Sequence, residues 1–154
     1  MSAETTQGKA GAVEMIRIAA FYLHESLCGI DISHVQEIHQ DLTFTKVPLA
    51  PEYVQGIMNL RGQIVTVIDQ SLKIGLPAAT ITTESRVVIV KSQGESIGLL
   101  VDRIVDVMTT EVGRIAPPPP NIHGAQGEFF KGVIHTDNNE LLALLDIEAI
   151  LRDI

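Results

Sequence analysis

The stretch Tyr53–Asp69, Y-V-Q-G-I-M-N-L-R-G-Q-I-V-T-V-I-D, decides the fold of this chain. It predicts two short strands joined by a tight polar link, with Ile57 and Met58 in the first strand and residues 64–68 in the second. A glycine in the link, Gly62, allows backbone angles that other residues resist. The second strand is rich in β-branched residues and does not alternate between apolar and polar positions. This pattern predicts a strand that is buried on both faces.

The composition describes a protein with an aliphatic core. Hydrophobic residues make up 45% of the 154 residues, yet tryptophan is absent and only two tyrosines and four phenylalanines occur. A chain of this length can bury one good core, or two small cores that share an interface. The formal charge of −8 disfavours nucleic acid as a partner, because phosphate backbones are bound by clustered Lys and Arg.

The sequence gives no sign of export or of membrane insertion. Apolar runs such as Leu141–Leu145 are far shorter than a membrane span, and the polar first residues contain no apolar signal core. A single cysteine, Cys28, excludes an internal disulfide and fits a reducing cytosol. We therefore expect a cytoplasmic protein whose residues 1–13 form a disordered tail.

The remainder of the chain predicts further short strands separated by turns. An S-x-x-Q pattern at Ser33 is typical of a capping box. The predicted segments are strands over 13–23, 27–32 and 44–47, a short helical turn or bent strand from Ser33, a helix over 70–76, a linker over 77–85, and a second series of strands from Arg86.

Two parts of the chain repeat each other. Gly29 in C-G-I and Gly98 in I-G-L lie 69 residues apart, and the same offset sets Val35 against Ile104. An internal duplication explains why all matches occur in the same order, with the offset growing only in loops; chance similarity of apolar strands is the alternative. The further matches are Glu37 with Asp106, Ile38 with Val107, Pro48 with Pro117, Gly56–Met58 with Gly132–Ile134, and Asp69 with Asp146.

The repeat predicts two small β-units, over about residues 15–80 and 84–152. Roughly five short strands in each unit are typical of a small barrel or sandwich. A β-unit of about 70 residues is marginally stable alone, so we expect the two units to pack through aliphatic faces and to leave a groove between them.

The residues that could carry chemistry do not form a recognisable site. The five histidines lack metal-ligand spacing and lie mostly in predicted turns, and Cys28 has no cysteine partner and is expected in the core. Asp69 and Asp146 each follow a buried strand, where an aspartate either caps the next helix or joins a carboxylate pair; capping is favoured because it explains both residues. No phosphate-binding loop, nucleophile elbow or zinc-binding H-E-x-x-H motif occurs.

One pair of charges stands out against the repeat. Glu37 lies in H-V-Q-E-I-H, in which Val35 and Ile38 are expected to point inward. Its counterpart in the second unit is Asp106, whereas Arg61 has no basic counterpart. We hypothesise that Glu37 and Arg61 form an ion pair at the rim of the groove; the alternative is that both are simply solvated, since exposed pairs contribute little.

With these residues in hand, the chain resembles the CheW-type coupling proteins of bacterial chemotaxis over about residues 15–152. Four stretches carry the resemblance in order: G-I-D-I-S-H-V-Q-E-I, V-Q-G-I-M-N-L-R-G-Q-I-V-T-V-I-D, I-G-L-L-V-D-R-I-V-D-V, and F-F-K-G-V-I-H followed by L-L-A-L-L-D-I-E-A-I-L. The resemblance implies a mainly β fold over residues 14–154. In that fold, two intertwined five-stranded SH3-like β-barrels are accompanied by a few short helices, and strands can be exchanged between the units.

The resemblance also implies a non-catalytic scaffold without cofactor or metal. Such proteins join the helical hairpin at the cytoplasmic tip of methyl-accepting chemoreceptors to the regulatory domain of a histidine autokinase, and they are recruited to receptor arrays at the membrane. Gly56 and Gly98 either belong to the receptor surface or serve only the barrel backbone. The residues expected in or beside the receptor surface are Val35, Glu37, Ile38, Gly56, Arg61 and Gly98, and those expected at the kinase surface are Leu42, Phe44 and Val47.

The sequence also allows other interpretations. A coupling or regulatory module of a similar pathway with an output other than swimming has the same sequence features. A regulatory domain of the kinase, or a receiver-fused coupling protein, is disfavoured because no receiver-like segment or ATP-binding motif is present. A small β-barrel enzyme would require converging titratable groups, and turnover abolished by Asp69→Asn would support it. A nucleic-acid-binding barrel is opposed by the acidic charge and the few aromatic residues.

Overall fold

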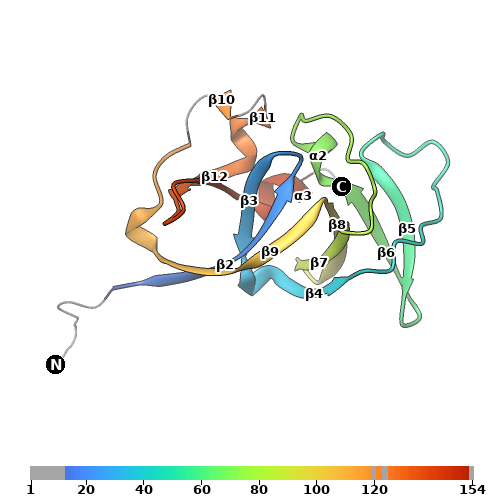
Figure 1. Ribbon diagram of the computed structural model, residues 1–154. Coiled ribbons are helices and arrows are strands. Elements are labelled where there is room, and N and C mark those ends of the chain that lie inside the picture. The colour runs from blue at the N-terminus through green and yellow to red at the C-terminus, as the bar shows by residue number, and fades with distance from the viewer. Residues whose placement is uncertain (1–12, 119–120, 123–124, 153–154) are drawn as a thin grey trace.

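Two five-stranded sheets dominate the computed structural model, which describes residues 13–118, 121–122 and 125–152 (Figure 1). The first sheet has the order β12-β13-β3-β2-β9 and the second the order β5-β6-β8-β7-β4. The first is formed by β2 (Met15–Leu23), β3 (Ser26–Asp31), β9 (Arg103–Glu111), β12 (Phe130–His135) and β13 (Leu141–Leu145); the second by β4 (Val35–His39), β5 (Val54–Leu60), β6 (Gln63–Asp69), β7 (Arg86–Ser92) and β8 (Glu95–Val101).

Short elements connect and cover these sheets. They are η1 (Ile32–His34), α2 (Gln70–Lys73), η2 (Val112–Arg114), the paired β10 (Asn121–Ile122) and β11 (Ala125–Gln126), η3 (Gly127–Phe129) and α3 (Ile147–Leu151). Twelve of the thirteen residues of the expected N-terminal tail, residues 1–12, lie outside the described residues. No helix in the described part of the chain combines the length and the apolar character that crossing a bilayer requires.

The two repeats exchange strands, since the last three strands of each repeat join the sheet that contains the first two strands of the other. β4 follows β3 along the chain but pairs with β7 in the second sheet, and β9 follows β8 but pairs with β2 in the first. Each sheet then curls until its edges meet, through the bridges between Thr45 and Ile57 and between Ala116 and Val133. The fold is therefore mainly β, with two intertwined five-stranded barrels and a few short helices, as the sequence predicted.

The two barrels are built alike, down to local irregularities. β4 pairs Val35 with Val90, and β9 pairs its counterpart Ile104 with Phe21, and in both cases the register shifts directly afterwards. β6 lies parallel to β8 and β13 lies parallel to β3, so the sheets also match in direction. This equivalence is what an internal duplication predicts, and chance similarity of apolar strands does not account for it.

The hairpin of β5 and β6 has the predicted tight link. Arg61 and Gly62 both have positive φ angles, of 51° and 84°, and the side-chain oxygen of Asn59 accepts a hydrogen bond from the Gly62 N–H at 2.8 Å. The prediction that the whole second strand is buried was wrong. Ile64 is 62% exposed near the tip, whereas Val65 and the residues beyond Thr66 are buried. The hairpin tip extends past the layer that covers the rest of the strand.

Three local predictions need correction. The predicted strand over 44–47 is a loop that touches the sheet only through the bridge at Thr45. The turn predicted to start at Ser33 is instead capped by Asp31, whose side chain accepts a hydrogen bond from the Ser33 N–H. The predicted helix over 70–76 ends at Lys73, because Gly75 adopts a positive φ angle of 96°.

Both aspartates that follow buried strands cap helices. Asp69 accepts a hydrogen bond from the Leu72 N–H at 3.3 Å, and Asp146 accepts one from the Ala149 N–H at 3.2 Å. The capping interpretation is confirmed. Asp69 is buried, and its second carboxylate oxygen accepts a further hydrogen bond from the Ala79 N–H at 2.9 Å, which fixes the start of the linker.

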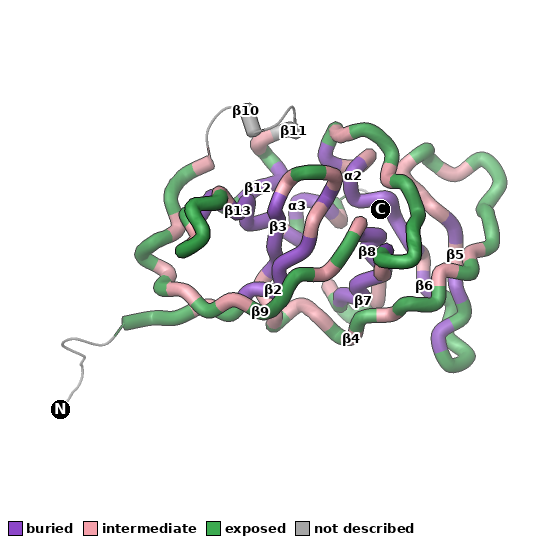
Figure 2. The backbone as a smooth tube through the Cα atoms, in the orientation of Figure 1, coloured by how far each residue is buried: buried purple, intermediate pink, exposed green. Residues whose placement is uncertain are grey.

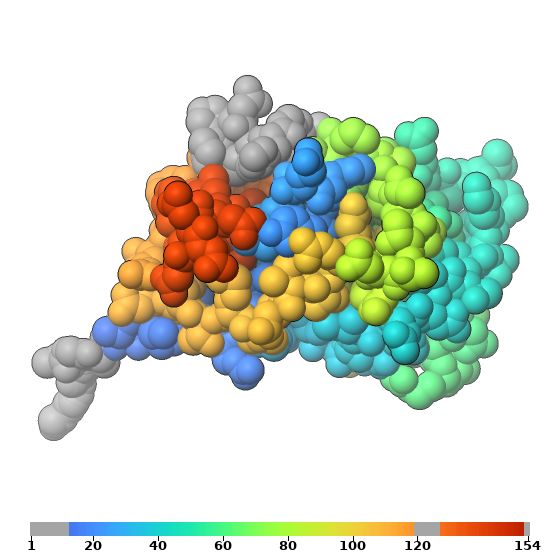
Figure 3. Space-filling view, viewed as in Figure 1, coloured from blue at the N-terminus to red at the C-terminus, as the bar shows by residue number. Residues whose placement is uncertain are grey.

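The linker between the units runs across the outside of the molecule. Figure 3 shows this yellow-green segment against the blue turn between β2 and β3. Nε2 of His24 in that turn lies 2.7 Å from the carbonyl oxygen of Pro77. The linker therefore covers part of the first repeat, in addition to joining it to the second.

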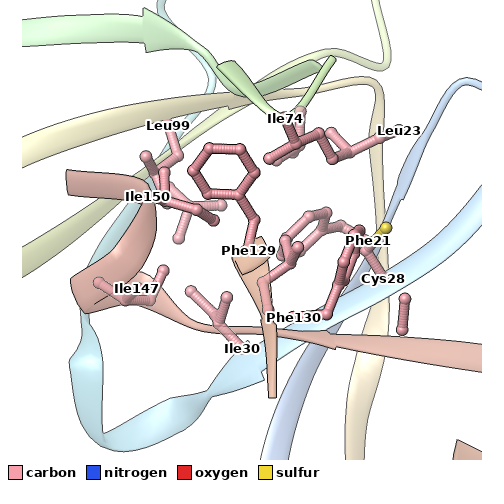
Figure 4. Packing of buried hydrophobic residues seen from close by; sticks show 14 of the residues in the cluster. Phe21, Leu23, Cys28, Ile30, Ile74, Leu99, Phe129, Phe130, Ile147 and Ile150 are labelled. Carbon is pink, nitrogen blue, oxygen red and sulfur yellow. The ribbon is translucent and has the colours of Figure 1, made fainter. Parts of the chain in front are cut away.

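One hydrophobic cluster is shared by both barrels. It takes Phe21 and Ile30 from the first sheet and Val88 and Leu99 from the second, and Ile150 of α3 packs into it. Figure 4 shows Phe21, Leu99 and Ile150 directed toward this common centre, and Figure 2 shows the buried segments gathered in the interior. Each large aliphatic side chain buried in this way contributes about 1.5–3 kcal/mol relative to its exposed state.

Cys28 belongs to this cluster, as predicted. It is buried, and burial raises the pKa of its thiol to about 12. Because the thiolate is the reactive form, this cysteine is inert in the folded protein.

We predict that Gly98→Ala destabilises the protein by about 1–3 kcal/mol, because the barrel has no room for a methyl group there. A Cβ at this position would lie 2.8 Å from Cγ1 of Val87 and 3.0 Å from Cγ2 of Val67. Urea unfolding measures the loss. The matched control is Gly113→Ala, where a Cβ would meet nothing within 4 Å, and equal losses for the two variants would contradict this account.

Candidate functional site

An ion pair joins the two edges of the second barrel. Glu37 lies on the edge strand β4, and Arg61 lies in the turn at the end of the other edge strand, β5. Nη1 of Arg61 donates to Oε1 of Glu37 at 3.2 Å and Nη2 donates to Oε2, so the contact is bidentate. Nε2 of His39 also lies 2.8 Å from Oε1 of Glu37. The hypothesised pair is therefore present, and it spans the seam at which the barrel closes.

The cluster is accessible to a partner. Arg61 is exposed, and Glu37 and His39 are half-buried. Hydrogen bonding and charge attraction by Arg61, with a smaller contribution from His39, hold the pKa of the Glu37 carboxyl below its usual range. The same contact raises the pKa of the Arg61 guanidinium. Both groups are therefore charged near neutral pH.

The apolar residues beside this pair differ in direction. Val35 is half-buried and packs against the shared cluster, as predicted, but Ile38 is 44% exposed, so its predicted inward direction was wrong. The register shift between Val35 and Glu37 changes which side chains face inward. Ile38 therefore adds an apolar contact surface next to the ion pair.

β9, the counterpart of β4 in the second repeat, presents a similar surface. Ile104 packs against the shared cluster, as its counterpart Val35 does, and further along β9 Val105 is 44% and Val107 40% exposed. The sequence analysis did not assign Val105 and Val107 to a surface. The repeat could have pointed to Val107, since it is the counterpart of Ile38, although Ile38 itself was expected to point inward.

The two glycines expected near the receptor surface are buried. A Cβ at Gly56 would lie 2.7 Å from the carbonyl oxygen of Thr45, and Gly56 has a φ angle of 152° that favours glycine. A Cβ at its counterpart Gly132 would meet the same obstacle, since it would lie 2.5 Å from the carbonyl oxygen of Ala116. Gly98 is closed in by Val87. Both Gly56 and Gly98 thus serve the barrel backbone, and any effect on a partner passes through the shape of the barrel.

The residues expected at the kinase surface lie in the loop over 40–52. Leu42 and Phe44 are half-buried against the core of the second barrel, whereas Val47 is 40% exposed. Leu49 was not singled out from the sequence, yet its side chain is fully exposed and its φ angle is 63°. A leucine in this left-handed conformation, with no burial to offset the cost, is uncommon.

Nothing in the described residues resembles a metal centre. No cluster of three or more His, Cys, Asp or Glu side chains that could ligate an ion occurs among them. Of the histidines, His24 contacts the linker and His39 contacts Glu37, while His123 lies outside the described residues.

We predict that the ion pair stabilises the protein only where Glu37 is ionised. Its pKa is lowered in the folded state, so the contribution is complete above the unfolded value of about 4.3 and is lost as the pH falls through the lower folded value. The melting temperature of Glu37→Gln should therefore lie below that of the wild type at pH 7, and the difference should disappear in acid. Glu84→Gln, at an exposed linker glutamate, is the control; a difference that grows as the pH is lowered through the acidic range would contradict the prediction.

Comparison with known proteins places this architecture in a family. The model of the CheW-like domain matches residues 17–154. The chain is 32% identical to the chemotaxis protein CheW of Treponema pallidum over 135 residues, covering 85% of this chain and 79% of that protein. It is 33% identical to CheW of Klebsiella aerogenes over 132 residues, covering 85% and 78%.

A solved structure extends the comparison to three dimensions. The crystal structure of the scaffolding protein TtCheW from Thermoanaerobacter tengcongensis matches with a TM-score of 0.82 and 31% identity, covering 96% of this chain and 94% of that one. The family match spans the residues that form both barrels, including β4 and the Arg61 turn. This chain belongs to the family of CheW-like domains.

Proposed function

We propose that this protein is a non-catalytic coupling protein that joins chemoreceptor tips to the regulatory domain of a histidine kinase. Its relatives are named as chemotaxis proteins, and its structural neighbour is described as a scaffolding protein. The observation that carries the proposal is the exposed ion pair of Glu37 and Arg61 beside the exposed Ile38, because charged and apolar groups together suit recognition of another protein.

The receptor surface is centred on β4. A helix that lies on an apolar strip takes its affinity from buried area and its orientation from a few charges. Ile38 supplies the apolar contact, while the ion pair of Glu37 with Arg61 and the half-buried Val35 hold that surface in place. Gly56 and Gly98 maintain the barrel beneath it.

The kinase surface is the loop over 40–52. Leu42 and Phe44 anchor this loop on the core of the second barrel, so that Val47 and Leu49 are displayed on its outer side. A partner domain with an apolar face would cover both side chains. Binding there would also offset the cost of an exposed leucine at a positive φ angle.

The two surfaces lie on different parts of the second barrel, which allows one molecule to contact two partners together. This arrangement supports a cytoplasmic protein that is recruited to receptor arrays at the membrane by its contacts with the receptors. The coupling role itself does not depend on the output of the pathway.

We predict that reversing either charge weakens binding of a receptor tip and that reversing both restores it. Glu37→Arg and Arg61→Glu should each weaken binding by roughly fivefold, because each leaves two like charges at the seam. The double variant rebuilds the pair with opposite polarity. Calorimetry with a soluble helical hairpin from a receptor tip measures the affinities.

Glu84→Arg controls for the change in net charge and should leave binding unchanged. Failure of the double variant to recover affinity would reject the pairing as the element that the receptor requires. Equal binding by all variants would reject β4 as the receptor surface.

We predict that Leu49→Gly weakens binding of the kinase regulatory domain about tenfold without loss of stability. Glycine accepts the positive φ angle that leucine resists, so the melting temperature should stay the same or rise. The control is Ile81→Ser at a 44% exposed isoleucine in the linker. Unchanged kinase affinity in Leu49→Gly, or an equal loss in Ile81→Ser, would contradict this surface.

A further inference from the structure

A groove of about 500 Å³ lies between the β7–β8 turn and α3, and its lining includes none of the residues assigned to the two surfaces described above. Its apolar side chains are Ile97 and Leu151, which are half-buried at the edge of the shared cluster. Gln93 in the turn and Glu148 in α3 lie at its rim, and the Ser92 hydroxyl lies 3.1 Å from both carboxylate oxygens of Glu148. The proposed coupling role assigns nothing to this groove.

The first repeat shows what fills the same position. The 69-residue offset matches Ile97 with Cys28, and the 77-residue offset between the capping aspartates matches Leu151 with Ile74. Cys28 and Ile74 are completely buried. There the chain continues from α2 as Gly75–Ala79, G-L-P-A-A, and Leu76 packs against the shared cluster to which Cys28 and Ile74 belong. In the first repeat, an extended apolar segment with a proline therefore lies at the position that corresponds to the groove.

The polar groups that hold the covering segment have counterparts in the second repeat. In the first repeat, the His24 ring contacts the carbonyl oxygen of Pro77. The second carboxylate oxygen of Asp69 accepts a hydrogen bond from the Ala79 N–H. Gln93 occupies the place of His24, with the same positive φ angle, and its exposed amide can donate to a carbonyl. Asp146 occupies the place of Asp69, and among the described residues only its Oδ1 accepts a hydrogen bond. The contact groups are thus repeated, and among the described residues no segment makes the corresponding hydrogen bonds in the second repeat.

The charge at the groove indicates the chemistry of its occupant. Glu95 and Glu148 bring two negative charges to the groove, against one positive charge from Arg152. A lysine or arginine beside the covering segment would complement this excess. The next residue of this chain, Asp153, carries another negative charge and is a poor match for the site.

From these observations we propose that the groove binds an extended peptide segment of a partner protein, with an aliphatic residue followed by proline and with Lys or Arg beside them. The aliphatic residue lies on Ile97 and Leu151. Gln93 donates to a peptide carbonyl, as His24 does in the first repeat, and Glu148 attracts the basic residue.

The test is a titration of the isotope-labelled full chain with the synthetic peptide acetyl-K-G-L-P-A-A-K-amide, followed by NMR. We expect saturable shift changes at Gln93, Ile97 and Leu151. Glu148→Lys should weaken binding roughly fivefold and improve binding of acetyl-E-G-L-P-A-A-E-amide. Gln93→Gly removes the amide but keeps the positive φ angle, so it should weaken binding while the protein stays folded.

Glu84→Lys is the matched control, because it makes the same charge change near the opposite end of β7 and should leave both affinities unchanged. Shift changes confined to other surfaces, or equal affinities in Glu148→Lys and Glu84→Lys, would overturn the proposal. So would absence of binding to the full chain together with binding to a chain shortened after Arg152, since that result would assign the groove to residues 153–154.

Discussion

The exchange of strands between the two repeats is the constraint on which the rest of the structure depends. Each sheet has five strands only because it combines two strands of one repeat with three of the other, and the chain crosses between the sheets before β4 and before β9. The starts of both strands, at Val35 and Ile104, pack on the same shared cluster. A β-unit of about 70 residues is marginal alone, so the exchange joins two such units into one cooperative structure.

The exchange also determines where partners can bind. β4 leaves the shared core and immediately becomes an edge strand, so buried and exposed side chains follow each other within a few residues. Val35 is anchored while Ile38 is displayed, and Glu37 is fixed between them by Arg61. A partner on β4 therefore contacts a rigid strand whose position depends on both halves of the molecule. Contacts mounted on such an element lose little conformational entropy on binding.

The features that the sequence predicted well are local ones. The hairpin link at Arg61–Gly62 and the caps at Asp69 and Asp146 depend on residues close together in the chain. Burial of Ile38 was predicted wrongly because an apolar residue in a strand gives no information on whether another layer covers it. Apolar pattern likewise suggested a strand over 44–47, although only Thr45 pairs. The tertiary partner decides both cases, and a sequence pattern does not identify it.

Comparison of the two repeats separates residues needed for the fold from residues available for function. Gly56 and Gly132 meet the same backbone obstacle, and both capping aspartates make the same hydrogen bond, so these pairs serve the barrels. The repeats differ at the surface. Arg61 has no basic counterpart, and the covering over α2 has no described counterpart over α3. Since the framework beneath is equivalent, these differences cannot be ascribed to the needs of folding. They indicate that each half of the molecule has acquired its own contacts.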